Sequence, residues 1–106
     1  DDQGALVLAE SLDANTGLQH LVLSDNQISD AGFEHLLNHL KHHPTLKSLF
    51  IANNKLSNYC LSLLLTFLKE NKSITRIDIS GHSFTDRSLL NYLTEFCDRY
   101  NIHLIS

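Results

Sequence analysis

The sequence predicts an α/β solenoid, with a short parallel sheet on its concave side and helices on its convex side. Three observations lead to this fold class. One pattern occurs three times and repeats every 28 positions, at residues 18–45, 46–73 and 74–101. The first half of each copy alternates apolar and polar residues, as a half-buried strand does. The second half has the apolar spacing of an amphipathic helix.

The first half of each copy predicts a strand with one buried face. In the first copy Leu21 and Leu23 flank Val22, so the leucines should face the interior and Val22 should face outward. Equal positions of neighbouring copies lie side by side in a parallel sheet, which places Val22 next to Phe50. The apolar positions of this half are Leu18, Leu21, Leu23 and Ile28, then Leu46, Leu49, Ile51 and Leu56, then Ile74, Ile77, Ile79 and Phe84.

The second half of each copy predicts a helix with one apolar stripe, at the spacing i, i+3, i+4 and i+7. The stripe consists of Phe33, Leu36, Leu37 and Leu40, then Leu61, Leu64, Leu65 and Leu68, then Leu89, Tyr92, Leu93 and Phe96. Polar residues that recur at the same period precede these stripes and should cap the helix N-termini. They are Asp2, Asp30, Asn58 and Asp86.

The 106 residues are expected to form a single domain, residues 1–106. Residues 1–17 are either a partial repeat of a longer array or an N-terminal cap. Residues 102–106 begin another copy and stop as a terminal stub. Because a solenoid needs about three units to be stable, this chain is close to the minimum.

The pattern LxxLxLxxNxI followed by a helix resembles the leucine-rich repeat. The length of the period resembles that of its ribonuclease-inhibitor-like subclass, found also in NOD-like receptors and tropomodulins. The resemblance implies a protein-binding horseshoe. In the family the asparagine bonds loop backbone inside the stack, and here it is Asn26, then Asn54. His82 replaces it in the third copy, so we expect the asparagine ladder to end or loosen there.

Composition excludes several classes of function. The net charge is −4 and the basic residues are scattered along the chain, which does not predict a nucleic-acid partner. No apolar run approaches about 18 residues, so we expect no membrane span. Cys60 and Cys97 stand nine positions apart within the repeat, about 13 Å along a helix, which is too far for a disulfide. Free, buried thiols and the absence of a signal-peptide pattern in residues 1–17 favour a cytoplasmic location.

The histidines allow two interpretations, a metal site or a plain polar surface. His35, His39 and His42 share one face of a predicted helix, but that face lies opposite the apolar stripe and points to solvent. Zinc needs three or four rigidly held ligands with supporting partners. We favour the surface interpretation, and expect neither a metal nor a cofactor.

The strand residues likewise allow a hydrolase or a non-catalytic face. His20 and Ser48 should be lateral neighbours, with Asp78 close by. That surface is an open sheet face without oxyanion donors or a water-excluding pocket. The sequence therefore favours a protein without catalytic activity.

The outward strand residues and adjoining loops form the candidate binding surface. Val22 and Phe50 should make a small apolar spot, flanked by the charges of Arg76 and Asp78, and an aromatic anchor beside arginine is typical of interface centres. The predicted partner-binding residues are His20, Val22, Ser24, Lys47, Ser48, Phe50, Asn53, Arg76, Asp78 and His82.

These features predict a cytoplasmic protein-recognition module, monomeric on its own, that binds another protein but neither nucleic acid nor membrane. In one form of the hypothesis it inhibits a partner enzyme by covering its active site, which is implied by the resemblance to ribonuclease inhibitor. The alternative is a sensor or scaffold segment of a larger multidomain receptor.

Overall fold

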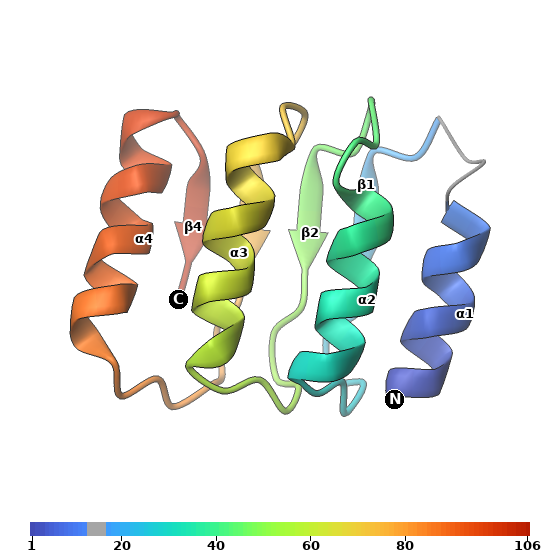
Figure 1. Ribbon diagram of the computed structural model, residues 1–106, viewed down its shortest axis with the longest axis horizontal. Helices are drawn as coiled ribbons and strands as arrows, with labels where there is room; N and C mark the ends of the chain where they lie inside the picture. Colours follow the sequence, from blue (N-terminus) through green and yellow to red (C-terminus); the bar gives the residue numbers. More distant parts are fainter. Residues whose placement is uncertain (13–16) are drawn as a thin grey trace.

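The computed structural model describes residues 1–12 and 17–106, which contain four helices alternating with four strands (Figure 1). Residues 13–16, part of the predicted N-terminal unit 1–17, lie outside the described residues. The elements in chain order are α1 (Asp2–Leu12), β1 (His20–Val22), α2 (Asp30–Leu40), β2 (Ser48–Phe50), α3 (Tyr59–Glu70), β3 (Arg76–Asp78), α4 (Arg87–Arg99) and β4 (His103–Ile105).

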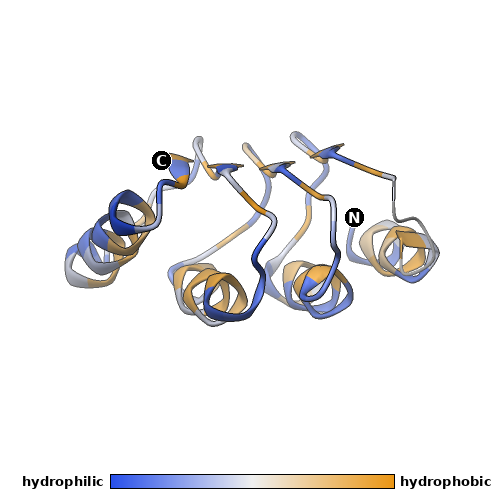
Figure 2. Ribbon diagram, turned by 90° about the horizontal axis from the view of Figure 1, so that it is seen from above, coloured by the Kyte–Doolittle hydropathy of each residue, from blue (hydrophilic) through white to orange (hydrophobic). Residues whose placement is uncertain are grey.

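The strands form one parallel sheet in the order β1-β2-β3-β4. Figure 2 shows the sheet as one layer and the helices as a second layer, spread over a wider arc, with their apolar sides facing the strands. The sheet is therefore on the concave side and the helices on the convex side. This arrangement confirms the predicted fold class.

The predicted core is confirmed in the first two complete copies. The strand leucines Leu21 and Leu49 are buried, and both complete helix stripes are buried as well. These stripes are Phe33, Leu36, Leu37 and Leu40 in α2, and Leu61, Leu64, Leu65 and Leu68 in α3. Both cysteines are buried and unpaired, as expected from their spacing.

The prediction for the last helix is confirmed for Leu93 but wrong for Tyr92 and Phe96. In α4 the fully buried side chains are Leu93 and Cys97, whereas Tyr92 is 55% exposed and Phe96 is only partly buried. Cys97 follows Phe96 by one position, which corresponds to a rotation of about 100° around the helix axis. The orientation of α4 about its own axis places the thiol of Cys97 against the core, at the position where α3 has the exposed Lys69. The same orientation moves the aromatic side chains of Tyr92 and Phe96 toward the surface.

The last strand also departs from the period. His20, Ser48 and Arg76 pair laterally at the full repeat period, but Arg76 then pairs with His103, one position short of that period. Leu104 therefore continues the inward row of Ile77, and His103 continues the outward row.

The asparagine ladder does not end at His82, contrary to expectation. Asn54 Oδ1 accepts a hydrogen bond from the backbone N–H of Asn26 at 3.0 Å, and its Nδ2 donates to the carbonyl of Ile51 at 3.0 Å. His82 repeats both bonds one unit later. Its Nε2 accepts from the N–H of Asn54 at 3.0 Å, and its Nδ1 donates to the carbonyl of Ile79 at 2.9 Å.

The predicted helix caps mostly act on the following repeat. Asp2 accepts hydrogen bonds from the backbone and hydroxyl of Ser29, the residue before α2. Asp30 bonds Ser57 in the same way, ahead of α3. Gly32 is required where Asp2 approaches, because a Cβ there would lie 2.3 Å from the carboxylate oxygen.

Asn58 and Asp86 complete this set. Asn58 Oδ1 accepts from the backbone N–H of Thr85 at 3.0 Å and of Asp86 at 3.2 Å, at the start of α4. Asp86 caps its own helix, as predicted, through the N–H of Leu89 at 3.0 Å.

Candidate protein-binding face

Every second residue of each strand points out of the sheet, which produces two rows on the concave side. The first row is His20, Ser48, Arg76 and His103, and the second row is Val22, Phe50, Asp78 and Ile105. We call these eight residues the concave face. Neighbours within a row lie about 4.8 Å apart, since that is the strand spacing.

An apolar spot forms at one end of the second row. Val22 is 67% exposed, and Phe50 beside it is partly buried. The predicted contact between these neighbours is confirmed by their register. The first row contributes less surface than expected, because Ser48 is only 6% exposed. Ser48 is therefore not available as the outward contact that was predicted.

The two charged residues of the third strand have different surroundings. Arg76 is exposed at the start of β3. Asp78 is partly buried, and its Oδ1 accepts hydrogen bonds from the N–H of Ser80 at 2.9 Å and from the hydroxyl of Ser80 at 2.7 Å. The carboxylate is thus fixed by the turn that follows its own strand.

The predicted loop residues divide into surface and structural groups. Lys47 and Asn53 are exposed. Ser24 is structural, because its hydroxyl accepts a hydrogen bond from the N–H of Ala52, just after β2, at 3.2 Å. His82 is partly buried in the asparagine ladder, so its ring nitrogens are occupied by backbone groups.

The loops after β1, β2 and β3 share a left-handed position at the same place in the repeat, and the first loop has a second one at Gln27, with φ of 56°. Asp25, Asn53 and Gly81 have φ of 64°, 53° and 80°. These residue types tolerate positive φ better than others. A Cβ on Gly81 would lie 1.8 Å from Asn53 Oδ1, so the glycine also makes room for the preceding repeat.

Two residues of the concave face were missed by sequence reasoning. His103 and Ile105 join the two rows because β4 pairs one position short of the repeat period. The run Ile102–Ile105 contains three apolar residues in four, so no strict alternation fixes its register. The full period would instead have placed Leu104 on the face.

The face lacks the features of a hydrolase site. His20 and Ser48 are neighbours as predicted, but the Ser48 hydroxyl is buried and Asp78 is bonded to Ser80. Within residues 1–12 and 17–106, no three His, Cys, Asp or Glu side chains gather as metal ligands could. None of the described helices is both long enough and apolar enough to cross a membrane.

The fold and this face define a solenoid of repeated strand–helix units with an open sheet surface. A family model described as "Leucine Rich repeat" matches residues 14–37. The structure is similar to that of leiomodin-1 actin-binding site 2, with a TM-score of 0.86 and 16% sequence identity. The match covers 99% of this chain and 62% of that chain. At this identity the likeness establishes the fold. A comparison with curated proteins gave no match.

Proposed function

We propose that this chain is a non-catalytic protein-recognition module that binds a partner protein through its concave face and adjoining loops. The observation that carries the proposal is the exposed Val22 beside Phe50 on an open sheet. Asp78 is the lateral neighbour of Phe50, and Arg76 stands two residues earlier on the same strand. Aromatic and arginine side chains supply most of the binding energy in protein interfaces. The leucine-rich repeat and the likeness to an actin-binding site support a protein as the ligand class.

The size of the face constrains how a partner docks. Four strands of three residues give a surface on the order of 200 Å², whereas a standard interface buries about 800 Å² per partner. The exposed loop residues Lys47 and Asn53 must therefore contribute. A protruding loop or helix fits this geometry better than a flat surface.

We assign the repeats to the ribonuclease-inhibitor-like subclass, which is supported by the constant register of β1, β2 and β3 and by the full helices between them. In the sharper form of the proposal, the module covers the active site of a partner enzyme in the cytoplasm. Loss of the partner's activity on addition of this protein would distinguish inhibition from simple binding.

The second candidate function is a sensor or scaffold segment of a larger multidomain receptor. The matched leiomodin chain is longer than this one, which agrees with a segment of a larger protein. A native gene product that contains a nucleotide-binding domain beside these repeats would favour the receptor. A short product that silences a co-purified enzyme would favour the inhibitor.

The test compares Phe50→Ala with wild-type protein for binding to the partner isolated from native extract. We expect the substitution to weaken binding by about 2 kcal/mol or more, roughly thirtyfold in Kd, while the melting temperature changes little. Val7→Ala is the matched control, because Val7 is 59% exposed but lies on α1. Equal affinities of wild type and Phe50→Ala would refute the proposed binding face.

A further inference from the structure

Basic residues that are scattered in the sequence gather at one edge of the folded solenoid. This is the edge where helices end and strands begin, and we call it the basic edge. Six of the eight Lys and Arg residues belong to it. They are Lys41, Lys47, Lys69, Lys72, Arg76 and Arg99. Lys55 and Arg87 lie on the opposite edge, where strands end and helices begin.

Helix dipoles explain only part of this distribution. Cations near helix C-termini are favourable, which accounts for Lys69 and Arg99 in the last turns of α3 and α4. Lys72 also donates to the carbonyl of Lys69 at 3.0 Å. Lys47 lies outside the helices, just before β2, and gains nothing from a helix end. The basic edge therefore carries more positive charge than helix stability requires.

The basic edge is hollowed between the second and third helices. A hollow of about 260 Å³ is lined by three lysines, Lys41, Lys47 and Lys72, and by one carboxylate, Glu70. Lys41 Nζ lies 3.8 Å from the Glu70 carboxylate, and both side chains are well exposed, so this pair is weak. Lys47 and Lys72 take no part in this pair and can attract an anionic group.

A second hollow adjoins the first through Lys72. It has about 290 Å³ and lies between the C-terminal end of α3 and the aromatic side chains of α4. Phe96 and Tyr100 line it, with their ring centroids 4.7 Å apart, and Tyr100 is 58% exposed. This volume is at the lower end of the range of ligand pockets, and it is large enough to take an apolar side chain.

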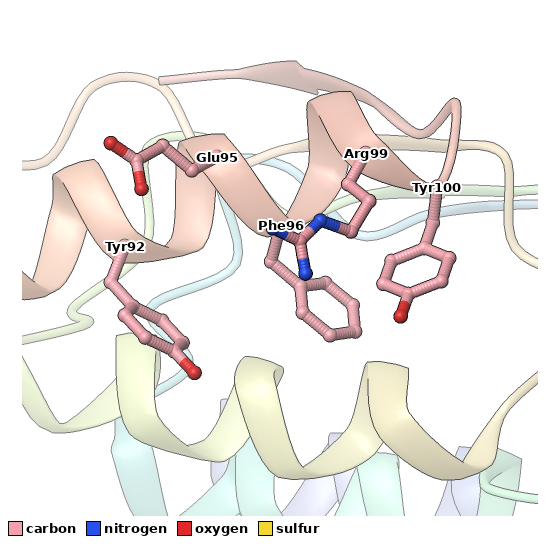
Figure 3. A pocket seen from close by; sticks show the side chains of 5 residues that line it. All are labelled: Tyr92, Glu95, Phe96, Arg99 and Tyr100. Carbon is pink, nitrogen blue, oxygen red and sulfur yellow. The ribbon is translucent and has the colours of Figure 1, made fainter.

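The same two rings also border a third hollow of about 250 Å³ along α4. Figure 3 shows Tyr92, Phe96 and Tyr100 extending from α4 toward α3, while Glu95 points away from them. The turn of α4 about its axis brings these rings to the surface. The first and second hollows share Lys72, and the second and third share Phe96 and Tyr100, so the three hollows lie next to one another. We call them together the groove, which is basic at one end and aromatic at the other.

We propose that this groove binds a linear acidic segment of a partner protein. Its carboxylates pair with Lys47 and Lys72, and an apolar side chain of the segment enters between α3 and the Phe96–Tyr100 pair. A uniform polyanion would match the lysines and leave the aromatic end empty. Lys47 also belongs to the loops that adjoin the concave face, whereas Lys72 and the aromatic residues of the groove lie outside that face.

The test uses a short fluorescein-labelled peptide in which acidic residues flank a Leu–Phe pair, and fluorescence anisotropy with the full chain. We expect saturable binding that weakens when Leu–Phe is replaced by Ser–Ser. Lys47→Glu combined with Lys72→Glu should weaken binding at least about tenfold. The matched control, Lys55→Glu with Arg87→Glu, makes the same change in net charge on the opposite edge and should leave affinity within about twofold.

The aromatic end has its own pair of variants. Tyr100→Ala should weaken peptide binding, and Tyr59→Ala should not, because Tyr59 is similarly exposed at the start of α3. Thermal melts confirm that each variant is folded. The proposal is overturned if the peptide does not bind, if both double variants weaken binding equally, or if duplex DNA competes as well as the unlabelled peptide does.

Discussion

Two histidines occupy positions that hold asparagine in the neighbouring repeat, and each reproduces some of the hydrogen bonds of that asparagine. His43 Nδ1 accepts from the N–H of Leu46 at 3.1 Å, as Asn71 Oδ1 accepts from that of Ile74 at 2.9 Å. The replacement works because Nδ1 is attached to Cγ, as the amide atoms of asparagine are. His82 replaces asparagine in the ladder after the strands.

The two rings must be opposite tautomers. Nδ1 of His43 faces N–H donors, so its proton resides on Nε2. Nδ1 of His82 faces a carbonyl and its Nε2 faces an N–H, so its proton resides on Nδ1. An imidazole with one protonated nitrogen supplies one donor and one acceptor, which is what the His82 site requires.

Replacement of His82 tests this equivalence. His82→Ala leaves the N–H of Asn54 and the carbonyl of Ile79 without their partner, so we expect a loss of about 1–3 kcal/mol in the free energy of unfolding. His82→Asn supplies both groups again and should cost distinctly less. Urea denaturation measures both values, and equal losses for the two variants would contradict the proposed role.

The thiols are predicted to be inert in the folded protein. Burial raises the pKa of Cys60 to about 12 and that of Cys97 to about 11. Because the thiolate is the reactive form, neither side chain should react with Ellman's reagent at pH 8 until the chain unfolds. Both should react at once in concentrated urea, and rapid reaction of either thiol in the native protein would show that it is accessible.

At the scale of elements, the starts of α2, α3 and α4 are each held by the preceding repeat. The carboxylates of Asp2 and Asp30 and the amide of Asn58 bond to backbone donors ahead of the next helix. An anion at a helix N-terminus is favourable, and the bond also joins two repeats. Neighbouring repeats are therefore coupled by polar contacts as well as by leucine packing. Such coupling matters because each repeat of a solenoid contacts only its neighbours and depends on them for its stability.

The Asp2 contact predicts a pH dependence of stability. The hydrogen bond from the Ser29 hydroxyl is the main reason why the pKa of Asp2 is lowered from 3.8. The Asp2 carboxylate therefore binds a proton more readily in the unfolded chain than in the folded one. The folded state is stabilised by this difference above about pH 4, and the stabilisation is lost as the pH falls through the lowered pKa. Asp2→Ala should cost about 1 kcal/mol at pH 7.

That difference between wild type and Asp2→Ala should shrink as the pH is lowered below 4, and urea titrations at several pH values measure it. Glu10→Ala is the control, because Glu10 is an exposed carboxylate on the same helix. A difference that stays constant down to pH 2 would show that the Asp2 side chain acts without its charge.

The strands and helices of the complete repeats were predictable because the apolar spacing within each element matches the side that it buries in the stack. Leu36 and Leu64 recur at helical spacing and are fully buried, and Leu21 and Leu49 alternate and pair in register. The last unit was less predictable. No following helix packs against α4 among the described residues, so its orientation depends on which side chain fits the core, and Cys97 fits where periodicity favoured Phe96.

The candidate site was predictable only in part for a related reason. Val22 and Phe50 follow directly from alternation along equal strands. The repeat pattern predicts which side of the sheet a side chain is on. It does not predict how exposed that side chain is, because exposure also depends on the sizes of its lateral neighbours. Ser48 is therefore buried at an outward position. The roles of Ser24 and His82 depend on backbone donors contributed by an adjacent repeat.

At the scale of the whole molecule, the repeat converts spacing in the sequence into position on a surface. Lys41 and Lys69 are one full repeat apart in the chain and equivalent in the solenoid, at the ends of adjacent helices. A stripe of positive charge can therefore form without any basic run in the sequence. The concave face and the basic edge are thus two surfaces built by one repeated pattern.

Site-specific photo-cross-linking tests the central claim, that the concave face is where a partner protein binds. A photoreactive phenylalanine analogue replaces Val22 on the sheet or His35, an exposed residue of α2 on the helix side. We expect irradiation in native extract to yield a discrete protein adduct from position 22, lost when Phe50→Ala is added, and none from position 35. An adduct from position 35 with none from position 22 would contradict the account.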